Sequence, residues 1–550
     1  MKTACKIVIV GGVAGGASAA AKARREDELA EIDVFERGPY ISFANCGLPY
    51  YIAGEIDDRA KLLIMTAETF WERYRIRAHV NHDVVAINRE NKTITVKEPG
   101  GATREVGYDK LILSQGAKPI VPPIPGVDLP HVFTLRDIPD MDRIVAYIDE
   151  RKPRRAVIIG GGFIGLEMAE AFHRLGMHVT VVERTPHILP LLDDDMATHV
   201  QNQTRRDDFI FKTGSEATRF TERSVEFADG SKVEADLVLM SVGVKAEVEL
   251  ARAAGLQIGD TGGVKTNARL ETSDSSIYAV GDAAEVTHRI TGARARIALA
   301  GPANRQGRIA GANAAGAHMI YPGALGTSIV RVLNMTVGFT GMNSAQATKA
   351  GFTFFTSLTR DFSHAHYYPS ATPVLIKIIA EESTGRLLGA QIVGEQGIDK
   401  RTDILATAIA GRMTVFDLED LDLAYSPPFG AANDPVNVAG FVAGHIVRGD
   451  VASISPENWK RNGEVVVDVR DADEVEQFGK LEKAVNIPLP QLRDRLEEIP
   501  REGRVVTYCQ KGQRGYLAAR ILQGRGFENV SNLRGGFLQW RLQPKAPGKS

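Results

Sequence analysis

The chain has 550 residues, too many for a single hydrophobic core, and this length predicts roughly three or four domains. A formal net charge of -2 gives no reason to expect a nucleic-acid partner. No apolar run reaches the roughly 18 residues that a membrane-spanning helix needs, so we expect no membrane span. The three cysteines, Cys5, Cys46 and Cys509, are too few for a disulfide scaffold and indicate a cytoplasmic protein with free thiols.

The N-terminal segment has the pattern of a strand, a glycine turn, a helix of small residues and a second strand. The strands are Lys6–Val10 and Ile32–Phe35, and the second ends in Glu36. An apolar run near the N-terminus is also a feature of a signal peptide, but Gly11 and Gly12 interrupt this run at once. We therefore predict a βαβ unit here.

The same pattern returns in the middle of the chain, after a proline-rich connection at Pro119–Pro130. A strand at Ala156–Ile159 leads through a glycine turn to a helix that ends near Leu175, and the strand Val179–Val182 ends in Glu183. Two such units in one chain predict two dinucleotide-binding domains of similar build.

The second glycine turn has the spacing G-x-G-x-x-G, at Gly160, Gly162 and Gly165. These glycines make the turn, let a pyrophosphate approach the backbone and pack helix on strand. The phosphate then lies at the positive end of the helix, and Glu183 is spaced to bind the ribose 2′-hydroxyl. Glu183 favours NADH, although Arg184 beside it leaves NADPH possible. A glycine-rich turn without a ligand is the alternative.

The first glycine turn departs from this pattern because Val13 stands where the middle glycine belongs. The backbone can still turn at Gly11 and pack at Gly16, and Glu36 supplies the acid for the ribose. A later strand ends in Asp282 before a helix. There the carboxylate can accept hydrogen bonds from ribityl hydroxyls, or it can simply cap the helix.

From about residue 323 the glycine turns become rare and the pattern changes. Predicted strands at Val374–Ile379 and Arg386–Val393 are followed by a predicted helix at Asp403–Gly411. This mixture indicates a separate α+β domain.

Together these segments resemble the flavoprotein disulfide reductase family over roughly residues 1–447. The resemblance implies an α/β homodimer with two Rossmann-like dinucleotide-binding domains and an α+β dimerisation domain. It implies FAD contacts at Gly11, Ala14, Gly16, Glu36, Arg37 and Asp282. The implied domains are the first part of the FAD-binding domain (1–120), the NAD(P)H-binding domain (121–270), the second part of the FAD-binding domain (271–322) and the dimerisation domain (323–448).

The loop around Cys46 indicates the subfamily. It contains one cysteine without a partner four residues on, so an internal redox disulfide is not available. A lone thiolate can cycle through a mixed disulfide, a persulfide or a sulfenic acid, and a buried inert cysteine is the alternative. The run Asn45-Cys46-Gly47-Leu48-Pro49-Tyr50 resembles coenzyme A-disulfide reductases and the related CoA-persulfide or polysulfide reductases. NADH oxidases and peroxidases share the scaffold.

The same resemblance implies further site residues. Tyr367 and Tyr425 would reach across the dimer to the other subunit's cysteine and stabilise or protonate the leaving sulfur, whereas simple packing is their alternative role. The phosphates of CoA need cations. The implied CoA contacts are Ser18, Lys22, Arg25, Ser42 and Asn45, although such a charge cluster is also typical of a solvated helix face.

A second signature follows residues 449–463, whose polar and turn residues predict a linker. Residues 464–550 contain apolar strands at Val465–Val469 and Val505–Tyr508 and resemble a single rhodanese domain. Backbone N–H groups, a helix dipole, Lys511 and Arg514 would favour a thiolate and an anionic persulfide at Cys509. An inactive regulatory copy is the alternative, but such copies usually lack the cysteine. The implied loop residues are Cys509, Gln510, Lys511, Gly512, Gln513 and Arg514.

We therefore expect an NAD(P)H-dependent FAD enzyme that reduces CoA persulfide, polysulfide or CoA disulfide through Cys46 and releases hydrogen sulfide and CoA. Cys509 would take up sulfane sulfur and pass it to CoA or toward Cys46. The alternatives are an NADH oxidase or peroxidase, and a redox sensor that binds a partner through the rhodanese domain. The twelve histidines show no metal-ligand spacing, so we expect no metal.

Overall fold

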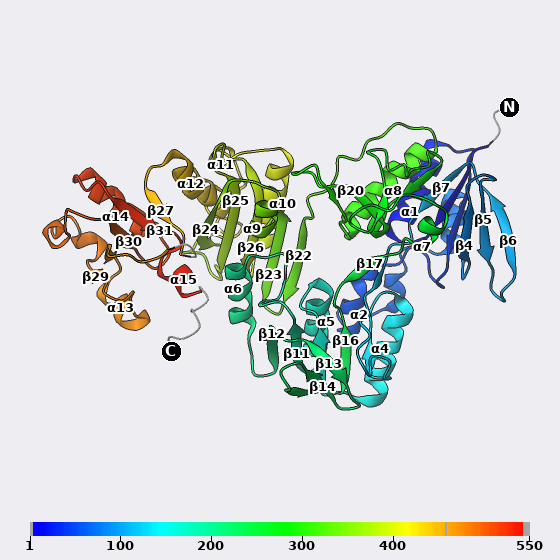
Figure 1. The fold of residues 1–550 in the computed structure, drawn as a ribbon, viewed down its shortest axis with the longest axis horizontal. Helices are drawn as coiled ribbons and strands as arrows, with labels where there is room; N and C mark the ends of the chain where they lie inside the picture. Colours follow the sequence, from blue (N-terminus) through cyan, green and yellow to red (C-terminus); the bar gives the residue numbers. More distant parts are fainter. Residues whose placement is uncertain (1–3, 457–458, 543–550) are drawn as a thin grey trace. The chain divides into compact units, whose positions relative to one another are not determined.

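The computed structural model describes residues 4–456 and 459–542 (Figure 1). The chain forms two compact units. The first contains residues up to 189 together with 205–326, and the second contains 190–204 and the residues from 327 onward.

Two five-stranded sheets form the framework of the first unit, and all their strands are parallel. Their strand orders, β19-β7-β1-β2-β3 and β12-β11-β10-β16-β9, confirm the doubled βαβ pattern. The first sheet contains β19 (Ile277–Ala279), β7 (Lys110–Leu113), β1 (Lys6–Val10), β2 (Glu31–Glu36) and β3 (Arg77–Val80). The second contains β12 (Phe209–Thr213), β11 (His178–Glu183), β10 (Arg155–Ile159), β16 (Leu237–Met240) and β9 (Val132–Phe133).

Each of these sheets has a small antiparallel sheet inserted along the chain, after β3 in the first and after β12 in the second. One consists of β4 (Asp83–Asn88), β5 (Thr93–Lys97) and β6 (Thr103–Gly107), the other of β13 (Ala217–Phe220), β14 (Ser224–Phe227) and β15 (Lys232–Glu234). An antiparallel pair, β8 (Ala117–Pro119) and β17 (Val244–Ala246), lies where the chain passes from one large sheet to the other and back.

Small residues bring two helices of the first unit into close contact. α1 (Ala14–Glu26) packs against α8 (Ala300–Ala314). A Cβ atom at Gly311 would lie 2.2 Å from the carbonyl oxygen of Ala19, and one at Gly307 would lie 2.1 Å from that of Gly15. Only glycine therefore permits this helix crossing. The other main helices of the unit are α2 (Leu48–Ile52), α3 (Ala67–Tyr74), α4 (Ile138–Arg151), α5 (Phe163–Arg174) and α7 (Glu249–Ala253).

In the second unit, residues 327–448 form an antiparallel sheet with the order β22-β23-β26-β25-β24. α12 packs on β24 and β25, and α10 packs on β23 and β26 (Figure 1). The strands are β22 (Ser328–Val332), β23 (Met335–Gly341), β24 (Phe354–Phe362), β25 (Pro373–Glu381) and β26 (Leu387–Gly394); the helices are α9 (Ser344–Lys349), α10 (Ile398–Ala410), α11 (Val415–Glu419) and α12 (Pro435–Arg448). Both predicted strands are present, and the predicted helix begins five residues earlier than expected, at Ile398.

One helix of the second unit was not anticipated in this place. α6 (Asp194–Thr204) falls within the stretch predicted to bind NAD(P)H, yet it packs against β23 and β26. Buried Lys377 holds its N-terminal end, with Nζ 2.8 Å from Asp195 Oδ1 and 2.9 Å from Asp193 Oδ2. The ion pairs explain why α6 lies with this sheet, but they join residues far apart in sequence.

The C-terminal part of the second unit is a parallel sheet with the order β27-β31-β30-β28-β29. β27 lies inside the segment predicted to be a linker, which corrects that prediction. β27 pairs in parallel with β31, and both Ile454 in this strand and Val451 just before it are buried. The elements are β27 (Ala452–Ile454), β28 (Val465–Asp468), α13 (Ala472–Phe478), β29 (Val485–Asn486), β30 (Val505–Tyr508), α14 (Gln513–Gly524), β31 (Val530–Leu533) and α15 (Gly536–Arg541).

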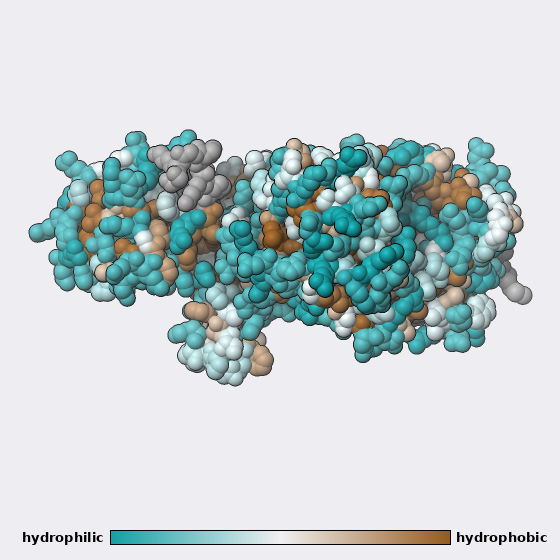
Figure 2. All heavy atoms as spheres, turned by 90° about the horizontal axis from the view of Figure 1, so that it is seen from below, coloured by the Kyte–Doolittle hydropathy of each residue, from teal (hydrophilic) through white to brown (hydrophobic). Residues whose placement is uncertain are grey.

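The face drawn in Figure 2 is mostly hydrophilic, with scattered apolar groups. Within the described residues, no helix combines the length and apolar character required to cross a membrane.

Candidate active sites

The two glycine turns have the backbone that nucleotide binding requires. Gly11 and Gly160 have positive φ angles of +93° and +112°, a region that side chains disfavour. A Cβ atom at Gly16 would lie 1.8 Å from the oxygen of Gly11, and one at Gly165 would lie 2.0 Å from that of Gly160. By contrast, the space at Gly162 is open, as expected where a pyrophosphate approaches the backbone.

The acid at the end of each second strand holds its glycine turn. Glu36 Oε2 accepts a hydrogen bond from the Gly12 N–H at 2.9 Å, and Glu183 Oε2 accepts one from the Gly161 N–H at 2.8 Å. Glu36 also accepts from Gly38 and Glu183 from Thr185. The two carboxylates therefore orient the two turns in the same way.

The residues around Asp282 fit a flavin. Asp282 belongs to a short 3-10 helix, Gly281–Ala283, which α8 holds because Gln306 Oε1 accepts from the Gly281 N–H at 2.8 Å. Burial raises the pKa of Asp282, and no described residue makes a hydrogen bond to its carboxylate. A half-buried acid without a protein partner suits a polyol chain. Arg37, in contrast, is bound to Glu247 at 2.6 Å.

The Cys46 loop is tied to the first glycine turn. Ser42, with φ of 49°, donates its N–H to the Gly12 oxygen at 2.9 Å and accepts at its own oxygen from the Ile64 N–H. Cys46 follows in a 3-10 turn, Asn45–Gly47, directly before α2. These backbone bonds place an exposed thiol beside the nucleotide cradle of the same unit.

Charges around Cys46 disfavour its thiolate in the protein alone. Although the residue is exposed, the protein around the sulfur desolvates it in part and so raises the pKa of the Cys46 thiol, and the carboxylates of Glu167 and Asp282 raise it further. Glu167 lies on α5, which packs against α2, and it accepts a hydrogen bond from Tyr50 Oη at 3.2 Å. Asn45 Oδ1 accepts from the Cys46 N–H at 3.1 Å. Sequence reasoning missed Glu167; its position two residues after Gly165 on the nucleotide helix is the only local signal.

Three of the residues predicted to bind CoA share one side of α1. Ser18, Lys22 and Arg25 follow the i, i+4, i+7 spacing of one helix face. Ser18 Oγ donates to Asn304 at 2.7 Å, Lys22 forms an ion pair with Glu26, and Arg25 is exposed. Ser42 and Asn45 lie in the cysteine loop described above.

The second unit brings the two predicted tyrosines together. Tyr367 lies in the β24–β25 loop and Tyr425 in the α11–α12 loop, and their hydroxyl oxygens are 3.2 Å apart. Both side chains are exposed, and their hydrogen bond raises the pKa of Tyr367. Fully buried Arg401 joins the two loops, since it donates to the Ser363 oxygen at 2.7 Å and pairs with Asp434 at 2.8 Å.

The Cys509 loop lies between β30 and α14 and directs a backbone donor at the sulfur. Buried Cys509 Sγ accepts from the Gly512 N–H at 3.1 Å. Gly512 and Gly536 have positive φ, and a Cβ atom at Gly536 would lie 2.3 Å from the Cys509 oxygen. The Gln513 N-terminus of α14 follows directly. A backbone N–H and a helix N-terminus next to the sulfur are features that favour an anionic sulfur.

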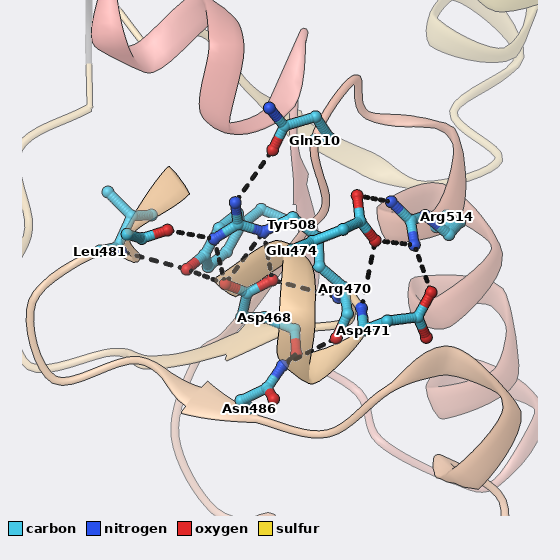
Figure 3. A network of polar contacts seen from close by, with 10 residues as sticks. Asp468, Arg470, Asp471, Glu474, Leu481, Asn486, Tyr508, Gln510 and Arg514 are labelled. Atoms are coloured by element: carbon cyan, nitrogen blue, oxygen red, sulfur yellow. Dashed lines mark hydrogen bonds and ion pairs between the residues drawn. The ribbon is translucent and has the colours of Figure 1, made fainter. Parts of the chain in front are cut away.

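A network of polar contacts holds Tyr508 and Gln510, the residues on either side of Cys509 in the chain (Figure 3). Asp468 and Arg470 are both fully buried and form an ion pair of 2.6 Å. Tyr508 Oη donates to Asp468 at 2.6 Å, and Arg470 Nη1 donates to Gln510 Oε1 at 2.9 Å. Arg514 is held by two bonds to Glu474, of 2.6 and 2.7 Å. The side chains of Gln510 and Arg514 therefore have fixed positions on the two sides of the loop.

Family models match these parts separately. The pyridine nucleotide-disulphide oxidoreductase model matches residues 5–307, its dimerisation domain matches 327–434, and a rhodanese-like domain matches 456–543. The chain therefore belongs to the pyridine nucleotide-disulphide oxidoreductase family and contains a rhodanese-like domain. This family implies FAD and NAD(P)H as cofactors, in agreement with the two glycine turns.

Two proteins of similar sequence are named for reactions of sulfur compounds that involve coenzyme A. An NAD(P)H sulfur oxidoreductase (CoA-dependent) of Pyrococcus furiosus is 37% identical over 79% of this chain and 98% of its own length. A coenzyme A disulfide reductase of Staphylococcus haemolyticus is 33% identical over 80% and 99%. Neither alignment spans the whole chain.

Solved structures cover the rhodanese domain as well. The reduced Bacillus anthracis CoADR-RHD has a TM-score of 0.96 and 45% identity, with 98% of both chains covered. An NAD-dependent persulfide reductase from A. fulgidus has a TM-score of 0.91 and 37% identity over 97% and 100%. A water-forming NADH oxidase from Lactobacillus brevis is less similar, with a TM-score of 0.77 and 27% identity over 81% and 100%.

Proposed function

We propose that this protein uses NAD(P)H to reduce CoA persulfide, polysulfide or CoA disulfide through Cys46, and that its rhodanese domain supplies sulfane sulfur. The observation that supports this most strongly is one exposed thiol, tied to the first glycine turn, in a chain that also contains a complete Cys509 loop. The names of the relatives above point to the same chemistry.

The glycine turns and their acids would hold the two cofactors. Gly11, Ala14, Gly16, Glu36, Arg37 and Asp282 would bind FAD, and Gly160, Gly162, Gly165 and Glu183 would bind NADH. When bound, FAD supplies two electrons taken from the nicotinamide. Glu183 is buried with both oxygens engaged, and its negative charge would repel a 2′-phosphate. This favours NADH over NADPH.

At Cys46 the chain would exchange one sulfur–sulfur bond for another. The Cys46 thiolate attacks CoA disulfide, a Cys46–CoA mixed disulfide forms, and one CoA thiolate leaves with the bonding electron pair. With CoA persulfide, hydrosulfide is the leaving group. Two electrons and two protons then return the mixed disulfide to the Cys46 and CoA thiols. Ser18, Lys22, Arg25, Ser42 and Asn45 would hold CoA.

The tyrosine pair would stabilise or protonate the sulfur that leaves during the reaction at Cys46. Tyr367 and Tyr425 present two neighbouring hydroxyls on an exposed surface, where they can donate a hydrogen bond or a proton. The dimerisation domain supports a homodimer in which each pair serves the cysteine of the other subunit. The free cysteines suit a cytoplasmic enzyme that acts on small sulfur compounds.

The deciding experiment is anaerobic NADH oxidation by the purified protein with polysulfide, CoA persulfide or CoA disulfide. We expect turnover that depends on the acceptor and disappears in Cys46→Ser. Cys509→Ser should retain reduction of CoA disulfide, because that substrate needs no sulfane transfer. Rapid NADH oxidation in air or with peroxide, without turnover of any sulfur acceptor, would contradict the proposal in favour of an oxidase.

A further inference from the structure

The Cys509 loop of the rhodanese domain packs against a strand of the dimerisation domain. Lys511 Nζ lies 5.3 Å from the centre of the Phe362 ring, at the end of β24. Arg534, which follows β31, donates to the Thr356 oxygen on the same strand at 2.5 Å. Both contacts lie within the second unit. The surroundings of Cys509 therefore include residues from outside its own domain.

Strand alternation shows which side chains of β24 meet the rhodanese domain. Successive residues point to opposite faces, so Arg360 shares its face with Phe362. Lys377, which pairs with Leu358 in register, lies on this face and binds α6 through Asp195. The alternate residues, Phe355, Ser357 and Thr359, are buried on the other face, where α12 packs.

Arg360 forms no ion pair with a described residue on this face, since the carboxylates of Asp193 and Asp195 there are bound to Lys377. No described residue offers its guanidinium an ion pair or a hydrogen bond, and burial lowers its pKa. The neighbouring His199 on α6 supplies no negative charge in either protonation state. Burial, together with the charge of Arg360, lowers the pKa of His199 to about 4, so this imidazole is neutral at physiological pH. A half-buried, unpaired arginine is costly unless it binds an anion.

Lys511, a residue of the Cys509 loop itself, supplies a second cation. Burial lowers the pKa of Lys511, and the charges of Arg360 and Arg514 lower it further, whereas Asp361 and Cys509 act in the opposite direction. Arg514 is already bound to Glu474. Burial raises the pKa of Asp361, whose side chain lies on the opposite face of β24 from Arg360 and Phe362. Lys511 and Arg360 therefore form a positively charged site at the Cys509 loop.

We propose that Arg360 of the dimerisation domain, together with Lys511, binds the anionic group of the sulfur donor that reacts at Cys509. The donor class is an anionic sulfane-sulfur compound, such as thiosulfate or the phosphate-bearing persulfide of CoA. The inference rests on the proposed sulfur-transfer role of Cys509. In it, the dimerisation domain and the rhodanese domain each supply one residue of the donor site.

The reaction is balanced without NADH. The Cys509 thiolate attacks the outer sulfur of thiosulfate, the sulfur–sulfur bond breaks, and sulfite leaves with the electron pair. A Cys509 persulfide remains. Cyanide then attacks its outer sulfur, thiocyanate leaves, and the Cys509 thiolate is restored. Thiocyanate formation therefore reports on this site independently of Cys46.

The test measures thiocyanate formation by the full-length protein at increasing thiosulfate concentration. In Arg360→Gln we expect the KM for thiosulfate to rise by about tenfold, because one charged hydrogen bond to the donor is lost. The kcat should stay within about twofold of the wild-type value. Arg360→Lys should restore most of the affinity. The control is Lys349→Gln, which removes an exposed cation from α9 of the same domain and should leave KM unchanged.

Donor charge separates binding from a purely structural role. CoA persulfide should show the same rise in KM as thiosulfate, and a rise confined to CoA persulfide would identify its phosphates as the bound group. Cysteamine persulfide, whose ammonium group is cationic, should bind Arg360→Gln at least as well as wild type. An unchanged KM for both anionic donors, or an equal rise for the cationic donor, would overturn the proposal. If wild type and Cys509→Ser alike form no thiocyanate, the sulfur-transfer role itself is wrong.

Discussion

At the scale of single residues, the reactivity of Cys46 depends on the charges that surround it. The thiolate is the attacking form, and two carboxylates, Glu167 and Asp282, oppose its formation. Because the pKa is raised, the thiolate fraction at any pH below that pKa is smaller than for an ordinary cysteine. A positive charge or hydrogen-bond donors supplied by bound cofactors or the tyrosines would reverse this effect.

Glu167→Gln tests this electrostatic account. Removal of one negative charge should lower the pKa of the Cys46 thiol, so that iodoacetamide alkylates it faster at a given pH and the rate profile moves to lower pH. The rate is measured on Cys509→Ser protein, so that Cys46 is the main target. Glu28→Gln, at an exposed acid of the same unit, is the matched control. Identical profiles for Glu167→Gln and its control would show that the charge of Glu167 does not contribute to this pKa.

At the scale of helices and strands, two pairs of packed elements hold the functional loops in place. The first is the crossing of α1 and α8, which fixes the glycine turn that begins α1 and the 3-10 helix that contains Asp282. The second is the pair β28 and β30, whose ends supply Asp468, Arg470 and Tyr508 to the network that holds the residues on either side of Cys509. In both cases the functional loop has the geometry that the packed elements impose.

Gly311→Ala should separate α1 from α8. The added methyl group would overlap the Ala19 carbonyl, and we expect a loss of about 1–3 kcal/mol in the free energy of unfolding, together with reduced flavin content. Chemical denaturation and flavin absorbance measure the two effects. Gly301→Ala lies on the same helix, where the added methyl would meet only the Arg305 side chain, at 3.6 Å or more. That control should be as stable as wild type, and equal losses in both would contradict the packing argument.

Arg470→Met should destabilise the rhodanese domain by about 3–5 kcal/mol, because it leaves the fully buried Asp468 carboxylate unpaired. Gln510 would also lose its partner, so thiocyanate formation should fall. Denaturant unfolding monitored by Trp459 or Trp540 fluorescence measures the change. Arg495→Met breaks an exposed pair with Glu498 and should have no measurable effect. A stable Arg470→Met protein would show that the buried pair is dispensable.

At the scale of the whole molecule, the proposed reduction site needs two subunits. Cys46 belongs to the first compact unit, whereas Tyr367 and Tyr425 belong to the second. If each tyrosine pair serves the cysteine of the other subunit, two inactive variants can complement each other.

Co-expression of Cys46→Ser with the double variant Tyr367→Phe, Tyr425→Phe provides this test. In the purified heterodimer, one site would lack both the cysteine and the tyrosine hydroxyls, and the other site would have all of them. We therefore expect about half of the wild-type turnover. Each parent homodimer should be nearly inactive. A heterodimer as inactive as its parents would place cysteine and tyrosines of one chain in the same site.

Sequence and structure contributed different parts of this picture. The sequence by itself determined the two dinucleotide folds, the Cys46 loop and the Cys509 loop, because glycine spacing, strand alternation and turn residues are local properties. Sequence reasoning also predicted Glu36 and Glu183, and the structure adds their shared role in holding the glycine turns.

The tertiary structure decided what depends on contacts between distant residues. It moved α6 from the predicted nucleotide domain to the second unit, because Lys377 binds Asp193 and Asp195. In the tertiary structure, part of the predicted linker forms the strand β27, because it can pair with the edge of β31. The tertiary structure also brought Glu167 close enough to affect the pKa of Cys46, and it put Arg360 on the same face of β24 as Phe362, which Lys511 contacts. Charge and burial act through space, so no spacing along the chain could have predicted these neighbours.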